Sequence, residues 1–226
     1  MTTEAATRPS SFAGPLAGGA AAGRRAIDVQ ETVARAVIAG LFVALAIRIG
    51  ADFLRTARIT GLLLLVSESL VVLLTVIRRR ATEVDRSWPA RLITLASMAG
   101  PPLVNPAVAA AWVSDACTAL VSACGLLVIV AGKLSLGRSF GLLPANRGLV
   151  RGGMYRVVRH PIYAGYLITH AGFLIGHLSV WNAAVLVGSD LALLVRAVCE
   201  ERTLGRDRGY AGYCAQVRWR VLPGVF

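Results

Sequence analysis

The stretch PIYAGYLITHAGFLIGHLSVWNAAVLVGSDLALLVRAV, residues 161–198, decides the fold class of this chain. It holds two apolar segments, 161–177 and 180–198, each near the roughly 20 residues that a membrane-spanning helix needs. The connection Gly176–Trp181 carries no lysine or arginine. Two such segments joined by so short a connection predict a helical hairpin inside a bilayer.

Four further apolar segments extend this assignment toward the start of the chain. They lie at about 32–53, 59–77, 91–112 and 115–135. Pro101, Pro102 and Pro106 interrupt the third of them and would kink or break a helix there. The chain is 56% hydrophobic and only 16% charged, with a mean hydropathy of +0.64, more apolar than a water-soluble core can absorb. We therefore predict an all-α integral membrane protein with five to six transmembrane helices.

Composition divides the chain into three parts. Residues 1–28 are rich in small and polar residues and lack the apolar core of a secretory signal, so they predict a disordered N-terminal tail. Residues 29–135 hold the first four apolar segments, and residues 136–226 hold a loop, the hairpin and a C-terminal tail. Only Lys133 among the 24 basic residues is a lysine, a usage that indicates a GC-rich, bacterial genome.

The net charge of +12 comes from short connections between apolar segments, not from one continuous basic face. This pattern favours lipid head groups over nucleic acid as the partner. The basic groups are Arg78, Arg79, Arg80, Arg86 and Arg91; Lys133, Arg138, Arg147, Arg151, Arg156 and Arg159; and Arg202, Arg206, Arg208, Arg218 and Arg220. The positive-inside rule places all three groups in the cytoplasm, whereas Arg55 and Arg58 would face outward against it.

A distinctive motif precedes the hairpin. The loop reads RSFG at 138–141 and continues as LVRGGMYRVVRHPIYAGY at 149–166, while the hairpin ends at Glu200 and Glu201. This order and spacing resemble the isoprenylcysteine carboxyl methyltransferase family, whose wider relatives include phospholipid methyltransferases and membrane sterol reductases. The resemblance covers about residues 136–226, which it identifies as the methyltransferase region.

The resemblance implies a bound S-adenosylmethionine, wrapped by the loop before the hairpin and the tail after it. The residues that it places around this cofactor are Tyr155, Arg159, His160, Pro161, Tyr163, Gly165, Tyr166, Glu201 and Tyr213. It also implies that Arg196 and Glu200 act on the substrate as the catalytic pair. In this reading the loop is a cytoplasmic cofactor loop and the tail is a C-terminal cap.

The residues themselves agree with a cofactor site at the start of the hairpin. Pro161 suits the first turn of a helix, so Arg159 and His160 stand at a helix N-terminus, where free N–H groups and the helix dipole favour an anion. The methionyl carboxylate of the cofactor is such an anion. The alternative for Arg159 is an anchor near lipid phosphates.

Arg196 and Glu200 are four residues apart and therefore share a helix face. An ordinary ion pair at the membrane border is one interpretation. In the other, the planar arginine holds a carboxylate substrate, which is already a nucleophile and needs only orientation and desolvation. An amine substrate would instead require a base, for which Glu200 or Glu201 is the candidate.

Several polar residues lie inside the predicted spans. Glu68 and Asp190 are costly to bury in lipid, so each is a functional candidate unless protonated or paired with Arg48 or a histidine. His170 and His177 are seven residues apart, about 10 Å along one helix, so they cannot jointly ligate one metal. We interpret both histidines as core or interface residues.

Gly165, Gly172 and Gly176 form a stripe of small residues on one helix face. We expect this stripe to pack the two helices of the hairpin closely together, in preference to forming a passage for the cofactor.

The sequence contains no glycine-rich dinucleotide fingerprint, no phosphate-binding loop and no zinc spacing. It therefore predicts no soluble methyltransferase domain and no metal. We expect an S-adenosylmethionine-dependent methyltransferase of the bacterial inner membrane, with its catalytic face in the cytoplasm and a prenylated or otherwise lipophilic substrate that comes from the surrounding lipids. The alternatives are a phospholipid or amine methyltransferase, an NADPH-dependent membrane reductase, and a membrane protein without enzymatic activity.

Overall fold

A computed structural model describes residues 59–105 and 114–226, apart from 82, 86 and 142–144, together with scattered residues between 32 and 55. Those scattered residues are helical. The predicted tail 1–28, and with it Arg48, Arg58 and Pro106, lies outside the described residues. The chain separates into two units, Met1–Val37 and Ile38–Phe226; in the first, only residues 32, 33, 36 and 37 are described. Everything below concerns the second unit.

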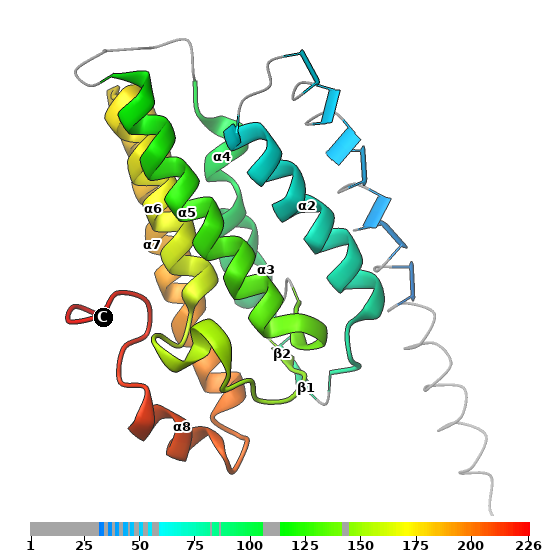
Figure 1. The fold of residues 1–226 in the computed structure, drawn as a ribbon. Coiled ribbons are helices and arrows are strands. Elements are labelled where there is room, and N and C mark those ends of the chain that lie inside the picture. Colours follow the sequence, from blue (N-terminus) through cyan, green and yellow to red (C-terminus); the bar gives the residue numbers. More distant parts are fainter. Residues whose placement is uncertain are drawn as a thin grey trace, which may run out of the picture. The chain divides into compact units, whose positions relative to one another are not determined.

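The second unit is built from helices, several of which run side by side (Figure 1). The α-helices are α2 (Ile59–Ile77), α3 (Trp88–Met98), α4 (Gly100–Leu103), α5 (Asp115–Leu136), α6 (Pro161–Gly176), α7 (Val180–Leu204) and α8 (Tyr210–Gln216). Two 3₁₀ turns, η1 (Gly137–Ser139) and η2 (Gly153–Arg156), and two short strands, β1 (Glu83–Val84) and β2 (Ala145–Asn146), lie between them. The helices predicted at 59–77, 115–135, 161–177 and 180–198 are therefore confirmed.

Two of the described helical stretches, Ala116–Ser139 and Val180–Leu204, are long and apolar enough to cross a membrane. The second continues beyond the predicted residue 198 and so carries Glu200 and Glu201 on helical backbone. The five to six transmembrane helices expected from the sequence stay a prediction.

The break expected in the third apolar segment is confirmed. Ser87 caps α3 by accepting a hydrogen bond from the Ala90 N–H (3.3 Å), and the helix ends at Met98, before Pro101 and Pro102 enter the short α4. Gly100 lies against α7, where an added Cβ would sit 2.8 Å from Ser189 Oγ. At Gly100 the broken backbone is thus covered by protein, whereas Pro101, Pro102 and Leu103 are exposed.

The small-residue stripe of α6 packs against α5, not against α7. An added Cβ at Gly165 would lie 2.8 Å from the carbonyl oxygen of Gly125, and one at Gly172 would lie 2.9 Å from the Ser122 nitrogen. The prediction that the stripe joins the two hairpin helices is therefore wrong. Helical periodicity identified the face correctly, but glycine on a face does not say which neighbour uses the close approach.

Lys133 is also misplaced by the sequence, which counted it among the loop charges. It lies in α5, fully buried, and its Nζ donates to the carbonyl oxygen (2.9 Å) and the Oγ (2.7 Å) of Ser67 on α2. Glu68 Oε1 is 3.8 Å from the same Nζ. The predicted pairing of an intramembrane acid with a histidine is found at Asp190, whose Oδ1 lies 2.6 Å from His170 Nδ1.

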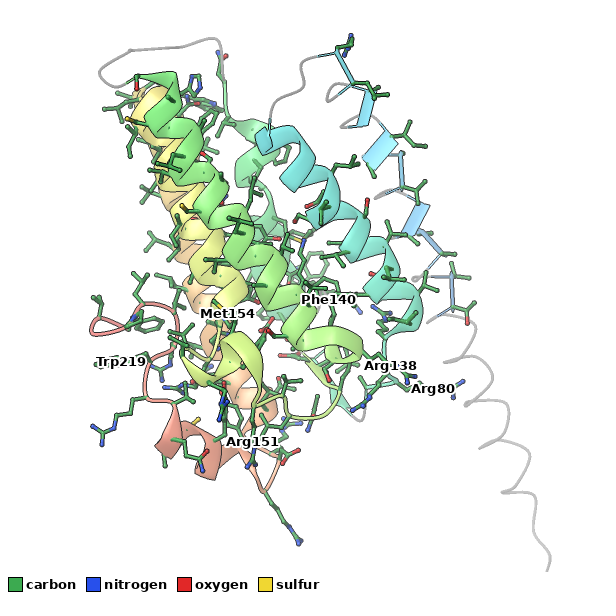
Figure 2. All side chains as sticks on the ribbon, in the orientation of Figure 1. Arg80, Arg138, Phe140, Arg151, Met154 and Trp219 are labelled. Carbon is green, nitrogen blue, oxygen red and sulfur yellow. The ribbon has the colours of Figure 1, made fainter. Side chains whose placement is uncertain are left out.

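The arginine-rich connections gather at one end of the helices (Figure 2). β1 pairs antiparallel with β2, and the Arg79 N–H donates to the Arg138 carbonyl (2.7 Å), so the connection after α2 is joined to the loop after α5. That loop in turn contacts the tail, because Arg151 Nη2 donates to the Gly209 carbonyl (2.9 Å). The loop, the tail and the end of α7 therefore form one assembly at this end.

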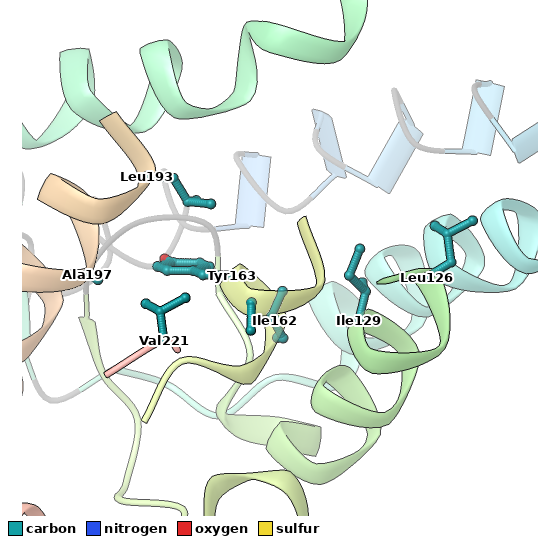
Figure 3. Close-up of a cluster of buried hydrophobic side chains, with 8 residues drawn as sticks. Leu126, Ile129, Ile162, Tyr163, Leu193, Ala197 and Val221 are labelled. Atoms are coloured by element: carbon teal, nitrogen blue, oxygen red, sulfur yellow. The ribbon is translucent and has the colours of Figure 1, made fainter. Parts of the chain in front are cut away.

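The main hydrophobic core lies where α5, α6 and α7 meet the returning tail (Figure 3). Its buried members are Leu126, Ile129, Ile162, Tyr163, Ala164, Leu193, Ala197 and Val221. Val221 comes from the tail and is fully buried, so the tail is an integral part of the core. This contact positions the tail over the ends of α6 and α7.

Candidate functional site

The tail fixes the start of α6 through two backbone hydrogen bonds. The N–H of Arg159 donates to the Trp219 carbonyl (3.0 Å), and the N–H of His160 donates to the Arg220 carbonyl (2.7 Å). Pro161, which has no N–H, follows as the first helical residue, as the sequence predicts. The N–H groups of Arg159 and His160 are therefore bound to the tail, so the anion affinity expected at this helix end rests on the side chains.

Glu201 of α7 contacts basic groups from two other segments, the start of α6 and the tail. Its Oε2 lies 2.9 Å from Arg159 Nη1 and accepts a hydrogen bond from Arg220 Nε (3.0 Å), while its Oε1 lies 3.3 Å from His160 Nε2. The side chain is only 10% exposed. Its neighbours thus compensate one buried carboxylate with two arginines and an imidazole, and this ties α6, α7 and the tail together.

Glu200 has a different set of partners on the other side of His160. Tyr163 Oη donates to Glu200 Oε1 (2.5 Å), and Arg196 Nε donates to the same oxygen (3.2 Å). The His160 ring stacks on the Tyr163 ring, with centroids 5.3 Å apart. The Arg196 guanidinium carbon lies 5.4 Å from the centroid of the same Tyr163 ring. The predicted pair Arg196 and Glu200 is thus held in a fixed geometry by aromatic contact as well as by charge.

A cavity of about 100 Å³ opens beside these two clusters. Five predicted site residues line it: Tyr155, Arg159, His160, Glu200 and Tyr213. The other lining residues come from the end of α5, the loop and the tail: Leu136, Ser139, Gly141, Ala145, Arg147, Gly148, Leu149, Val150, Leu204 and Tyr210.

Three tyrosines of the cavity stay protonated at neutral pH. Burial raises the pKa of Tyr155 and Tyr210 well above the usual value, and burial raises the pKa of Tyr213 to about 12. Tyr213 Oη donates to the Tyr155 carbonyl (2.8 Å). Arg159 Nε is buried and makes no hydrogen bond within the described part of the chain, and the buried Tyr210 Oη lies near the side chains of Arg159 and Cys214. Both atoms are donors that a ligand in the cavity could satisfy.

Residues 116–207 match the family of phospholipid methyltransferases. The matched segment covers less than half of the chain and runs from the start of α5 to just beyond the end of α7, so it includes the loop, Arg196, Glu200 and Glu201. This family belongs to the superfamily that the motif indicated, and the predicted resemblance is confirmed. No curated protein matches the chain. The match indicates a membrane methyltransferase, a class that typically uses S-adenosylmethionine.

The cavity suits that cofactor chemically. Glu200 places a carboxylate where a positively charged sulfonium could be offset, and Arg159 and His160 place basic groups where a carboxylate could be held. Ligand pockets for molecules of drug size usually measure about 300 Å³ or more, which exceeds the free space here. Asn146 and Arg151 of the loop bind the α7–α8 turn beside this cavity.

Six predicted site residues do not line the cavity. Tyr163 and Arg196 contact Glu200, which does. Pro161 and Gly165 are buried in the helix packing, the latter against α5. Tyr166 lies one turn deeper in α6 than Tyr163, with its ring 6.2 Å from that of His170. Glu201 binds Arg159 and His160 and so orients two cavity residues.

Sequence reasoning missed Tyr210 and Arg147, which both line the cavity. Tyr210 stands three residues before Tyr213 on one face of α8, and their rings are 6.0 Å apart, so helical spacing was the available signal. Arg147 lies in a loop without periodicity, and its position depends on the β1–β2 pairing next to it.

Proposed function

We propose that this protein is an integral membrane methyltransferase that transfers a methyl group from S-adenosylmethionine to a lipophilic acceptor at the cytoplasmic face of the bilayer. The acceptor we favour is the carboxylate of a prenylated cysteine or of a similar lipophilic acid. The observation that carries the proposal is that Arg159, His160 and Glu200 line one cavity with Tyr155 and Tyr213, at the arginine-rich end of the helices.

Arg159, His160 and the three tyrosines would hold the cofactor. S-adenosylmethionine supplies an electrophilic methyl group on a sulfonium, and Glu200 is the cavity carboxylate that could face that charge. The phenols of Tyr155, Tyr210 and Tyr213 remain donors at neutral pH because burial raises their pKa. The aromatic rings would exclude water, which could otherwise accept the methyl group in place of the substrate.

Arg196 would orient an acidic acceptor. It is buried beside Glu200 on α7, and its Nη1 also reaches Ser97 Oγ on α3 (3.4 Å), so the guanidinium plane is fixed from two helices. A carboxylate held by a planar guanidinium in a dry site needs no general base. The chain's task would be to align and desolvate this nucleophile.

An amine of a phospholipid head group is the second candidate acceptor, and two observations favour it. The family match is to phospholipid methyltransferases, and Glu200 lines the cavity whereas Arg196 is not among its lining residues. For an ammonium acceptor Glu200 would remove the proton that must leave before the nitrogen can attack. His160 Nδ1, 3.7 Å from Glu200 Oε2, would be next in line for that proton.

Calorimetric titration of the purified protein with S-adenosylmethionine and S-adenosylhomocysteine tests the cofactor. We expect binding that is lost in Arg159→Ala and kept in the matched control Arg91→Ala, an exposed arginine of α3 away from the cavity. Unaltered binding in Arg159→Ala would contradict the role of that residue. Binding of NADPH but neither adenosyl compound would replace the proposal with a reductase.

The acceptor is tested with cofactor labelled in its methyl group. Label in a base-labile ester of farnesylcysteine supports the carboxylate, and label in the head group of phosphatidylethanolamine supports the amine. Absence of binding by all cofactors, with function in cells unchanged in Arg196→Ala and Glu200→Ala, would indicate a protein without enzymatic activity.

A further inference from the structure

The C-terminal loop 217–226 exposes large apolar side chains at the end of the molecule that carries the arginines. Trp219 is 40% exposed, Leu222 37% and Val225 78%, and Val157 of the segment that follows η2 is exposed as well. We call these four residues the tail patch. Figure 2 shows Trp219 on the loop at the outside of the helices. Large apolar side chains gathered in so short a segment mark a surface that meets something other than water.

The tail patch lies at a defined level along the helices. Its backbone is bonded to Arg159, and His160 in turn lies 3.3 Å from Glu201 near the end of α7. From Trp181 to Glu201 the rise of α7 is about 30 Å, which equals the hydrocarbon thickness of a bilayer at about 30 Å. Trp181 is 59% exposed at the far end. The backbone of Trp219 is thus tied to one end of this stretch of α7 and Trp181 lies at the other, which suits the preference of tryptophan for the two membrane interfaces.

The charges around the tail patch fit an anionic lipid surface. Two exposed arginines adjoin the patch in the sequence: Arg156 directly precedes Val157, and Arg218 directly precedes Trp219. Neighbouring apolar and basic side chains match the layer in which lipid head groups meet the hydrocarbon.

The same loop holds the candidate site. The carbonyls of Trp219 and Arg220 bind the N–H groups of Arg159 and His160, and Arg220 Nε binds Glu201. A contact to the Trp219 side chain would therefore influence Arg159, which lines the cavity, through the backbone hydrogen bond between the two residues.

From these contacts we infer that the tail patch is seated in the head-group layer of an anionic bilayer, and that this lipid contact holds Arg220, Arg159 and His160 in place. The membrane surface is thus a structural component of the site. The inference goes beyond the proposed function, and its first test does not depend on the reaction.

The first test measures the depth of Trp219. In the variant Trp88→Phe/Trp112→Phe/Trp181→Phe it is the sole tryptophan, and the protein is reconstituted into vesicles that contain phosphatidylglycerol and phosphatidylcholine brominated at defined acyl positions. We expect stronger quenching by bromine near the carbonyls than by bromine near the chain ends, with little quenching by acrylamide. Emission quenched by acrylamide and by neither bromolipid would overturn the inference and would leave a soluble partner as the occupant.

The second test measures the coupling. Trp219→Ser keeps the backbone carbonyl but removes the anchor, so affinity for S-adenosylhomocysteine in these vesicles should fall by about fivefold or more. Trp88→Ser removes a tryptophan that is more exposed (68%) and that makes no hydrogen bond to the site among the described residues, so it should leave the affinity unchanged. Equal affinity in both variants would overturn the coupling. If neither the parent protein nor the variants bind the compound, the proposed function fails, while the depth measurement still decides the inference.

Discussion

Two regions of the molecule pair acidic with basic side chains, and they differ in what surrounds the pair. In the interior, Glu68 faces Lys133 and Asp190 faces His170, one basic residue for each acid. At the arginine-rich end, Glu200 and Glu201 share His160, Arg159, Arg196 and Arg220, and Glu200 borders a cavity. An excess of basic groups beside open space can receive a ligand, whereas a closed one-to-one pair can only join helices. We therefore expect the interior to govern stability and the arginine-rich end to govern chemistry.

The largest effect should come from breaking the interior pair. Lys133→Ala would leave Glu68 and the Ser67 carbonyl without their buried partner, and the free energy of unfolding should fall by about 3 kcal/mol. Unfolding titrations in detergent measure this loss. The double variant Lys133→Met/Glu68→Gln should recover part of it, because no unpaired charge remains. Unchanged stability in Lys133→Ala would show that the pair does not join α2 to α5.

Arg196→Lys tests the role of the arginine-rich end in the chemistry. Lysine keeps the charge but not the planar fork, so we expect methyl transfer to a carboxylate acceptor to slow by about 100-fold. The melting temperature and the affinity for S-adenosylhomocysteine should change little. Steady-state rates with both acceptor classes provide the measurement; retained activity on an amine acceptor alone would assign the chemistry to Glu200.

Gly165→Ala sharpens the comparison, because the sequence assigned this residue to the cofactor and the structure places it in packing. The added Cβ would meet backbone atoms of Gly125 and Ile129, which cannot move independently, so stability should fall by about 2 kcal/mol. Gly188→Ala is the control, since a Cβ there meets nothing within 4 Å. Cofactor affinity lost at unchanged stability would return Gly165 to the cofactor shell.

The smallest effects separate two tyrosines of the cavity. Tyr213→Phe removes the hydrogen bond to the Tyr155 carbonyl and should cost about 1 kcal/mol of stability. Tyr210→Phe removes a hydroxyl that lies near Arg159 and Cys214 without a backbone partner, so it should cost less stability than Tyr213→Phe and weaken S-adenosylhomocysteine binding. Thermal unfolding measures the stability of both variants, and calorimetry measures their affinity for S-adenosylhomocysteine. Equal changes of stability and of affinity in the two variants would argue against a ligand at Tyr210.

The sequence predicted the helices well, because long apolar segments leave few alternatives in a bilayer and Pro101 and Pro102 mark the break between α3 and α4. It also predicted the residues that meet at the hairpin end, since Arg159 and His160 precede one helix and Glu200 and Glu201 end the next. Partners across the fold were less accessible. Lys133 resembles a loop charge until the position of α2 is known.

The contacts of the tail with the start of α6 were also not predictable from the sequence. Nothing in the sequence around Trp219 and Arg220 announces that their carbonyls bind the start of α6, because a backbone hydrogen bond in an irregular segment leaves no pattern. Arg147 reaches the cavity through such a loop, whereas Tyr210 lies on α8, where its spacing from Tyr213 was a usable signal. Helical periodicity does not describe irregular segments, and the predicted cavity lining was incomplete there.

The return of the tail to the hairpin has a consequence for the order of synthesis. Residues 161–204 are made before residues 217–221, yet Arg159 and His160 acquire their backbone partners only from that later segment. A nascent chain that stops short of Trp219 would therefore remain unable to close the cavity. Completion of the candidate site therefore depends on residues 217–226, because they supply the carbonyls that hold Arg159 and His160.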